Sequence, residues 1–206
     1  MATIECKPDG PYLVKDLEVL VGPDGNRITA NPAMALCRCG GSATKPFCDG
    51  THRKNGFSGA RLGGGSEDRR DDYRGAAVTI HDNRALCAHA GRCTDKLASV
   101  FKYGSEPWID PDGAAAEAVA EAVRNCPSGA LGYSLGGAEQ VDAIPGEPAV
   151  VVARDGPYEV TGVRLEGQEW LRGASKQRYT LCRCGGSRNK PFCDGTHWSI
   201  GFKDAG

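Results

Sequence analysis

Short apolar runs, broken by glycine and proline, predict strands and turns along much of the chain. The clearest is AAVTIHD at 76–82, whose apolar residues alternate as they do on one face of a strand. MAL at 34–36 and YTL at 179–181 each lead into a C-x-C pair, so we expect each pair to end a strand. PWIDP at 107–111 predicts a further short strand or a turn.

One segment has a helical period instead. DGAAAEAVAEAVRNC at 112–126 places Ala115, Val119 and Val123 on one face, as an amphipathic helix does. Asp112 is the expected N-cap, and a proline follows the end of the segment. We therefore expect a mainly β fold with small α+β parts.

The chain contains an internal repeat. Residues 37–57 and 182–202 share 16 identical positions out of 21, and DGPY occurs upstream of both copies. The 206 residues include 29 glycines and 12 prolines, which favours small, turn-rich units over one large core. The predicted organisation is a first repeat at 1–57, a linker at 58–75, a middle domain at 76–135, a linker at 136–150 and a second repeat at 151–206.

Charge and hydropathy exclude several classes of protein. Lys and Arg number 25 against 26 Asp and Glu, so no basic excess indicates a nucleic-acid partner. No stretch approaches the roughly 20 apolar residues that a membrane span needs. The opening MATIECKPDGPYLV does not have the pattern of an export signal. We expect a soluble cytoplasmic protein.

The ten cysteines are grouped in a way that suits metal sites better than disulfides. Nine fall into three sets of three, and Cys6 stands alone, so we expect it to be a packed thiol. The sets are Cys37, Cys39 and Cys48; Cys87, Cys93 and Cys126; and Cys182, Cys184 and Cys193.

Each repeat adds one histidine to its three cysteines, and the spacing predicts two pairs of metal ligands. Cys37 and Cys39 share one side of a strand end, while Cys48 and His52 are four apart and stack if Asp49 starts a helical turn. Two irons with two ligands each give a Cys3His [2Fe-2S] cluster. A structural zinc site and unliganded cysteines remain alternatives, although C-x-C followed by C-x3-H is unusual for zinc.

Other residues recur in both copies and could surround the metal. Paired glycines allow a tight turn with N-H groups near the cluster, and a proline stiffens the entry to the second ligand pair. Recurrent lysine, phenylalanine and arginine side chains either cover the cluster or support the repeat fold. These positions are Gly40, Gly41, Gly185, Gly186, Pro46, Pro191, Lys45, Lys190, Phe47, Phe192, Arg38 and Arg183.

The run C-x-C-x2-S-x3-P-x-C-D-G-T-H at 37–52 and again at 182–197 closely resembles the signature of CDGSH-type iron-sulfur proteins, the mitoNEET family. A threonine replaces the serine that names the family. The resemblance implies one [2Fe-2S] cluster per motif. Its ligands would be Cys37 and Cys39 on one iron with Cys48 and His52 on the other, and Cys182 and Cys184 with Cys193 and His197 in the second motif.

Family members with one motif form intertwined homodimers, and this chain is similar to such a dimer joined end to end. We therefore expect the tandem repeats to form a pseudo-dimer within a monomer. Because the first residues are not a long apolar run, we expect no N-terminal membrane anchor of the mitoNEET kind.

The middle domain has its own cysteine pattern. CAHAGRC at 87–93 followed by Cys126-Pro127 is similar to a bacterial ferredoxin motif with Ala90 in place of one cysteine. It resembles the divergent mono-cluster ferredoxin domain that accompanies CDGSH motifs in some bacterial proteins. Three thiolates could hold [3Fe-4S], or [4Fe-4S] with His89 or an outside ligand. An empty, degenerate domain is the alternative.

These patterns favour a carrier over an enzyme. We expect electron transfer, or cluster transfer to an apo-protein, with an unidentified redox partner or acceptor. The sequence contains no recognisable Ser-His-Asp set, phosphate loop or dinucleotide fingerprint, and His81 has no partner in sequence. A redox or acid sensor and a structural zinc protein are the alternatives.

Overall fold

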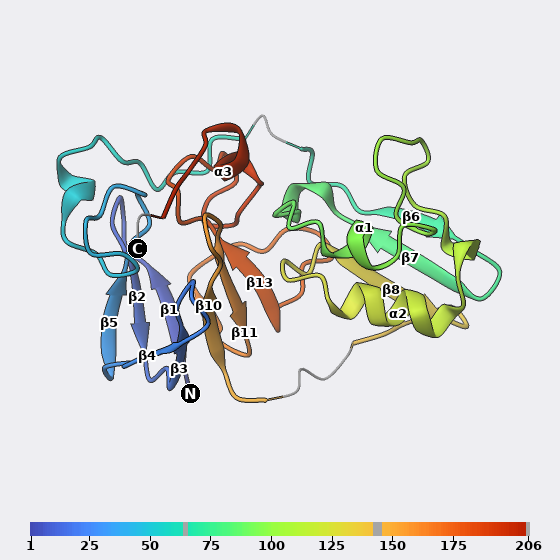
Figure 1. Ribbon diagram of the computed structural model, residues 1–206, viewed down its shortest axis with the longest axis horizontal. Helices are drawn as coiled ribbons and strands as arrows, with labels where there is room; N and C mark the ends of the chain where they lie inside the picture. The colour runs from blue at the N-terminus through green and yellow to red at the C-terminus, as the bar shows by residue number, and fades with distance from the viewer. Residues whose placement is uncertain (64–65, 142–145, 205–206) are drawn as a thin grey trace.

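Both ends of the chain build one β-rich body, the repeat body, and the middle of the chain builds a smaller body beside it (Figure 1). This computed structural model describes residues 1–63, 66–141 and 146–204. The predicted linkers 58–75 and 136–150, and the end of the predicted second repeat, therefore each lie partly outside the described residues.

The two repeats supply equivalent strands, and three of these strands alternate buried and less buried residues. The first repeat contains β1 (Thr3–Cys6), β2 (Tyr12–Lys15), β3 (Val19–Val21), β4 (Arg27–Ile28) and β5 (Ala33–Leu36). The second contains β10 (Ala149–Val152), β11 (Tyr158–Thr161), β12 (Arg164–Glu166) and β13 (Arg178–Leu181).

Each repeat contributes to the sheet of the other: the second repeat gives β12, and the first gives β3 together with its hairpin partner β4. The sheet orders are β12-β1-β2-β5 and β13-β11-β10-β3-β4. β12 pairs in parallel with β1, with Leu165 opposite Ile4, and β3 pairs in parallel with β10, with Leu20 opposite Val150. Neither sheet is complete without the other repeat, which confirms the predicted β-rich tandem pseudo-dimer.

Two buried tyrosines join the repeats at their centre. The Tyr12 hydroxyl donates to the carbonyls of Cys182 and Pro191, at 2.8 and 3.1 Å. Tyr158 makes the equivalent pair of bonds to the first motif, at 2.9 and 3.0 Å. Their rings meet edge to face with centroids 6.0 Å apart. Each tyrosine thus supports the motif of the opposite repeat.

The middle body is a four-stranded antiparallel sheet covered by a helix. Its strands, in spatial order, are β6 (Asp71–Arg74), β7 (Val78–Asp82), β8 (Leu131–Leu135) and β9 (Ala138–Glu139). α2 (Ala116–Arg124) buries Val119 and Val123 against this sheet, as the helical pattern predicts. None of the helices in the described residues is long and apolar enough to cross a membrane.

Three local expectations differ from the structure. β6 lies inside the predicted linker 58–75 and pairs with β7, and β9 lies inside the predicted linker 136–150. Asp112 is not the cap of α2, because its carboxylate accepts the N-H of Ala76 at 2.7 Å and Ala115 occupies the N-cap. Asp112 instead lies in a 3-10 turn, η3 (Pro111–Gly113), ahead of the helix.

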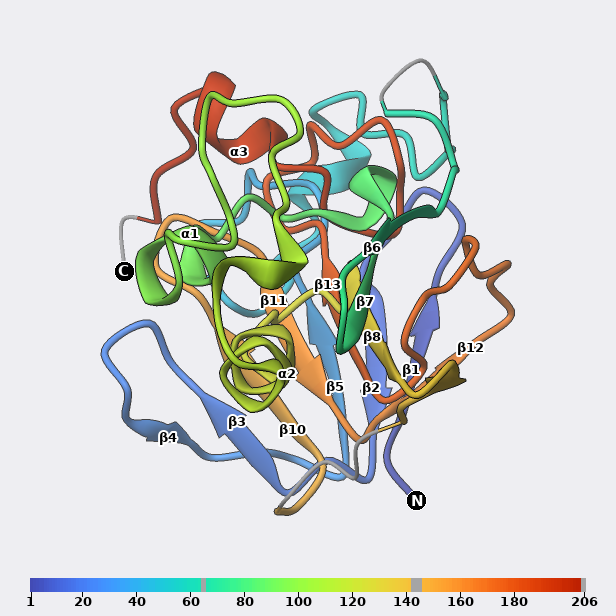
Figure 2. The same ribbon diagram turned by 90° about the vertical axis from the view of Figure 1, so that its right-hand side faces the viewer.

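The middle body packs against the second repeat. Arg178 of β13 donates to the carbonyl of Arg124 at the end of α2, at 2.5 Å. Asn83 donates to the Arg172 carbonyl at 2.8 Å. Figure 2 turns this body toward the viewer, with α2 and α1 (Arg92–Lys96) at the front. The junction places one motif, but not both, next to the middle body.

Removing either central hydroxyl should weaken the repeat body. Tyr12→Phe and Tyr158→Phe each leave two buried carbonyls with one bond fewer, which costs about 1–3 kcal/mol of unfolding free energy. Tyr103→Phe is the matched control, since Tyr103 is 93% exposed and should change nothing. Urea denaturation measures the difference. Equal stability of all three variants would contradict the role given to the two hydroxyls.

The strand exchange within one chain also predicts the assembly. Because each sheet already contains its partner strand, we propose that the protein is a monomer of 21.7 kDa. Sedimentation velocity should give that mass across the micromolar range. An obligate dimer, with the strands exchanged between chains, would contradict this arrangement.

Candidate metal centres

The first ligand pair of each motif lies directly after a strand. Cys37 follows β5 and Cys182 follows β13, so the predicted strand ends are confirmed. The Cys37 and Cys39 sulfurs lie 3.9 Å apart, and the Cys182 and Cys184 sulfurs lie 3.8 Å apart. Two ligands of a tetrahedral metal with bonds of about 2.3 Å are separated by about 3.8 Å. Each pair therefore has the spacing of two thiolates on one metal.

The second pair is formed by a helical turn. The Cys48 Sγ lies 3.4 Å from His52 Nδ1, and the Cys193 Sγ lies 3.4 Å from His197 Nδ1. The turn is capped by a left-handed glycine rather than by Asp49, whose carboxylate accepts the N-H groups of residues 43 and 51. In both motifs Nδ1 is the ring nitrogen that faces the sulfur.

Backbone N-H groups donate to the sulfurs of both pairs. Gly41 N lies 3.5 Å from the Cys39 sulfur, and Gly50 N lies 3.4 Å from the Cys48 sulfur. The second motif repeats both contacts at 3.4 and 3.5 Å. Such bonds favour the thiolate over the thiol, which is the form that binds metal.

The two motifs cross each other at their first loops. Cys39 and Cys184 form an isolated antiparallel bridge. The next residues, Gly40 and Gly185, have φ of 76° and 78°. A Cβ on either glycine would lie 2.5 or 2.6 Å from the carbonyl oxygen of the opposite cysteine. Only glycine permits both this conformation and this approach.

The recurrent lysines and phenylalanines brace the loop between the ligand pairs. Ser42 donates its hydroxyl to the Phe47 carbonyl at 2.7 Å, and the Lys45 ammonium donates to the Ser42 carbonyl at 2.7 Å. The second motif contains the same two bonds. These contacts support the fold, and an influence on the metal stays a prediction.

The recurrent arginines lie under the loops. Arg38 is buried and stacks on Tyr12 at 5.3 Å and on Phe57 at 5.6 Å. Arg183 stacks on Tyr158 at 5.7 Å and forms an ion pair with Asp204. A buried guanidinium stacked on aromatic faces adds positive charge close to each ligand set.

Thiol electrostatics differ between the ligands. Burial raises the pKa of the Cys37 and Cys193 thiols. The pKa of Cys184 is lowered to about 7, chiefly by its hydrogen bond with Cys182. Since metals bind thiolates, loading these sites must displace protons from the buried thiols.

The two motifs differ in exposure. His52 and Cys48 are half-buried and line an open groove of about 790 Å³ with Arg53 and Phe57. His197 is only 4% exposed, and the His89 ring of the middle body lies against Gly195, two residues before it. Burial lowers the pKa of His197.

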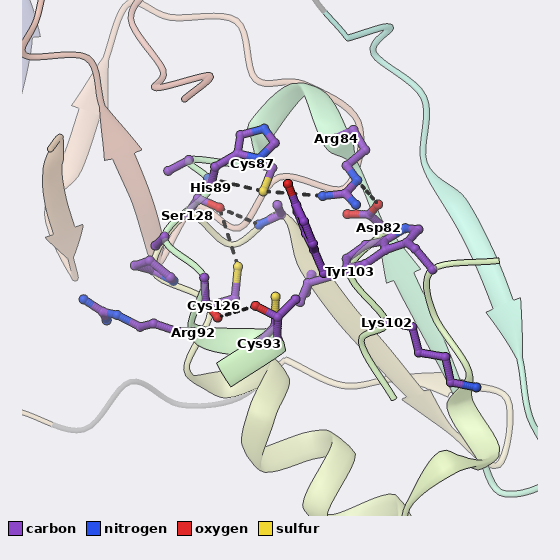
Figure 3. Close-up of a pocket in the computed structure, with 18 of the residues that line it drawn as sticks. Asp82, Arg84, Cys87, His89, Arg92, Cys93, Lys102, Tyr103, Cys126 and Ser128 are labelled. Carbon is purple, nitrogen blue, oxygen red and sulfur yellow. Dashed lines mark hydrogen bonds and ion pairs between the residues drawn. The ribbon is translucent and has the colours of Figure 1, made fainter. Parts of the chain in front are cut away.

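Three cysteines line one cavity of about 650 Å³ in the middle body (Figure 3). Cys87 follows the 3-10 turn η2 (Arg84–Leu86), Cys93 lies in α1, and Cys126 follows α2. Ala90 lines the same cavity, where the ferredoxin pattern has a further cysteine. Burial raises the pKa of the Cys87 thiol to about 11.

The other residues weighed in the sequence lie elsewhere. His89 is exposed, and its ring fills the space beside Gly195 of the second motif, away from Cys93 in Figure 3. Its ligand role stays untested. Cys6 packs against the core, and burial raises its pKa to about 11, as expected for an idle thiol.

Sequence reasoning missed Asp82. It is 2% exposed, lines the middle cavity, and lies 3.3 Å from Arg84 Nε, with neither carboxylate oxygen in a hydrogen bond of normal geometry. Burial raises its pKa to about 6. Neither Asp82 nor Arg84 belongs to a recognisable sequence motif, so their contact can be seen only in the structure.

The folded chain brings together a histidine, an aspartate and a serine that the sequence did not connect. His81 contacts Asp72 through Nδ1 at 2.6 Å and Ser134 through Nε2 at 2.7 Å. The three side chains come from adjacent strands, so no sequence spacing could reveal them. Ser134 is 8% exposed on a strand paired on both sides, where the ladders use the backbone N-H groups that an oxyanion site would need. We interpret the set as a polar chain that links β6, β7 and β8.

The donor arrangement can be tested against a single metal ion. A structural zinc site gathers four donors around one point. Among the described residues, no three His, Cys, Asp or Glu side chains converge in that way. Each CDGSH motif presents its donors as two pairs, one of two cysteines and one of a cysteine with a histidine.

Comparison with known proteins agrees with this geometry. Residues 9–53 and 155–198 match the family described as iron-binding zinc finger, CDGSH type, and residues 73–136 match the divergent 4Fe-4S mono-cluster family. The uncharacterized protein YjdI of Escherichia coli K12 is 36% identical over 61 residues, which cover 30% of this chain and 80% of that protein. YjdI of Escherichia coli O157:H7 gives the same values. No solved structure matches.

The matched segments coincide with the structural features described above. The two CDGSH matches contain both crossing motifs, and the mono-cluster match contains the cavity with its three cysteines. The chain therefore belongs to the CDGSH-type iron-sulfur family, as a member in which two CDGSH units flank a divergent mono-cluster domain.

Proposed function

We propose that this iron-sulfur protein holds one [2Fe-2S] cluster in each CDGSH motif and acts in electron transfer or in cluster transfer to another protein. The observation that carries the proposal is the pairwise geometry of the donors, with 3.9 and 3.8 Å within the cysteine pairs and 3.4 Å within the cysteine-histidine pairs.

The chain's own residues have separate tasks in this proposal. Three thiolates and one neutral imidazole bind the metal, and the glycine N-H groups stabilise the thiolates. When bound, a [2Fe-2S] cluster supplies a one-electron redox couple. A histidine ligand carries no charge in its neutral form, so it leaves the centre less negative than a fourth thiolate would.

A third cluster in the middle body is part of the proposal. Cys87, Cys93 and Cys126 face one cavity, and Ala90 leaves one corner without a thiolate. Three thiolates suit a [3Fe-4S] cluster, or a [4Fe-4S] cluster whose fourth iron takes a non-cysteine ligand.

An acid sensor is the second candidate function, and the exposure of His52 favours it. Imidazole binds metal only when neutral, so protons compete with the metal at an accessible histidine. A sensor changes the state of a partner without delivering an electron or a cluster. Delivery to an acceptor therefore separates the two functions.

Protein purified without oxygen should contain two [2Fe-2S] clusters in the CDGSH motifs. Cys48 and Cys193 occupy equivalent positions in the two motifs. Cys48→Ala and Cys193→Ala should each remove one such cluster and leave the other. Visible absorbance with iron, zinc and sulfide analysis measures this. Two equivalents of zinc without acid-labile sulfide would favour the structural zinc protein instead.

Cys126→Ala should remove iron from the middle body alone. After mild oxidation, the parent should show the electron paramagnetic resonance signal of a [3Fe-4S] cluster, because one corner of the cubane lacks a cysteine ligand. The variant should lose that signal and keep both [2Fe-2S] clusters. Cys6→Ala is the control and should lose neither. A parent with two full CDGSH clusters and no further iron would mark the middle domain as degenerate.

A further inference from the structure

We propose that the two CDGSH motifs face different partners. The second motif is engaged by the chain's own middle body, and the first motif presents its His52 face to an acidic surface of a separate protein. This inference rests on the proposed carrier function, because it assigns delivery of the electron or cluster to one of the two motifs.

Several residues that differ between the two copies make contacts with other segments in the second copy. Five of the 21 aligned positions differ, and in the second copy three of them contact neighbouring segments. Asn189 donates to the Ala85 carbonyl of the middle body at 2.5 Å. Trp198 lines the middle cavity. Arg188 donates to the Gly63 carbonyl at 2.9 Å. Three of the five divergent residues of the second motif thus contact other segments of the chain, although Trp198 remains 66% exposed.

The same positions of the first motif face solvent. Arg53 replaces Trp198, Lys54 replaces Ser199, and Thr44 replaces Asn189. All three first-motif residues are exposed. His52 is half-buried, whereas His197 is 4% exposed, and His52 lines the open groove of about 790 Å³ at this face.

Charge identifies the kind of partner that fits the open face. Arg53 and Lys54 are adjacent, and within the described residues neither has an ion-pair partner, whereas the nearby Lys7 is paired with Glu5 at 2.7 Å. Two unpaired cations beside an accessible ligand favour an acidic surface and speed its approach.

Two acidic residues lie on the same loops, and both are engaged by the backbone. Asp9 accepts the N-H of Gly59 at 2.8 Å. Asp49 accepts two N-H groups, at 2.8 and 2.9 Å. These carboxylates are therefore held against the loops, while the side chains of Arg53 and Lys54 remain available.

Zero-length carbodiimide cross-linking tests the surface without requiring transfer. The probe is an apo-[2Fe-2S] ferredoxin with a surface rich in Asp and Glu, mixed with the loaded full-length protein. Lys54 should dominate the cross-linked peptides, over the equally accessible Lys15 and Lys203. An even spread over exposed lysines, or no cross-link at all, would overturn the docking surface.

The rate of cluster transfer to the same probe is the second readout. Arg53→Gln/Lys54→Gln should slow transfer about tenfold at low ionic strength, and the difference should shrink as salt is added. Lys15→Gln/Arg27→Gln is the matched control, since it removes the same charge and β4 lies at the end of the repeat body away from both motif loops (Figure 1). The control should change the rate less than twofold.

The two readouts separate this inference from the carrier function. Cross-linking at Lys54 without cluster transfer would support the docking surface and contradict the cluster-transfer form of the proposed function, leaving electron transfer. Transfer that is equally fast in both double variants would support the carrier and overturn the docking surface. The absorbance of each variant before mixing must equal that of the parent, so that a slower rate reflects approach and not cluster loss.

Discussion

The close approach of the two motif loops at Cys39 and Cys184 is the constraint on which the rest of the structure depends. Backbone meets backbone there, and a Cβ on Gly40 or Gly185 would collide with the opposite cysteine. The strand exchange, the tyrosine hydroxyls and the stacked arginines all stabilise the position of these two loops. Because the ligand pairs project from the same loops, the geometry of both metal centres follows from one contact.

The middle body breaks the symmetry that the crossing creates. It is inserted between the repeats in sequence and packs on the second repeat, through contacts such as Arg178 with Arg124 and Asn189 with Ala85. His197, in the repeat that the middle body contacts, is buried, whereas His52 is half-buried. Two nearly identical motifs therefore acquire different environments without any change in their proposed ligands.

Much of this organisation could be predicted because it depends on the spacing of cysteines and apolar residues that are close together in the sequence. The C-x-C pairs after apolar runs predicted the strand ends, and the period of residues 112–126 predicted α2. The pseudo-dimer was predicted from the repeat together with its resemblance to a family of homodimers. Side-chain competition and long-range pairing could not be predicted in this way. Asp112 found the Ala76 N-H instead of a helix end, and β6 needed a partner strand to become more than a charged linker. His81 likewise gained its partners only when three strands came together.

A crystal structure of the anaerobically purified protein, with anomalous scattering recorded on both sides of the iron and zinc absorption edges, tests the central claim most directly. We predict two iron atoms in each CDGSH motif, one at the cysteine pair and one at the cysteine-histidine pair. The two iron pairs should lie on either side of the contact between Cys39 and Cys184. One zinc ion at each motif, with four donors drawn around it, would contradict the account.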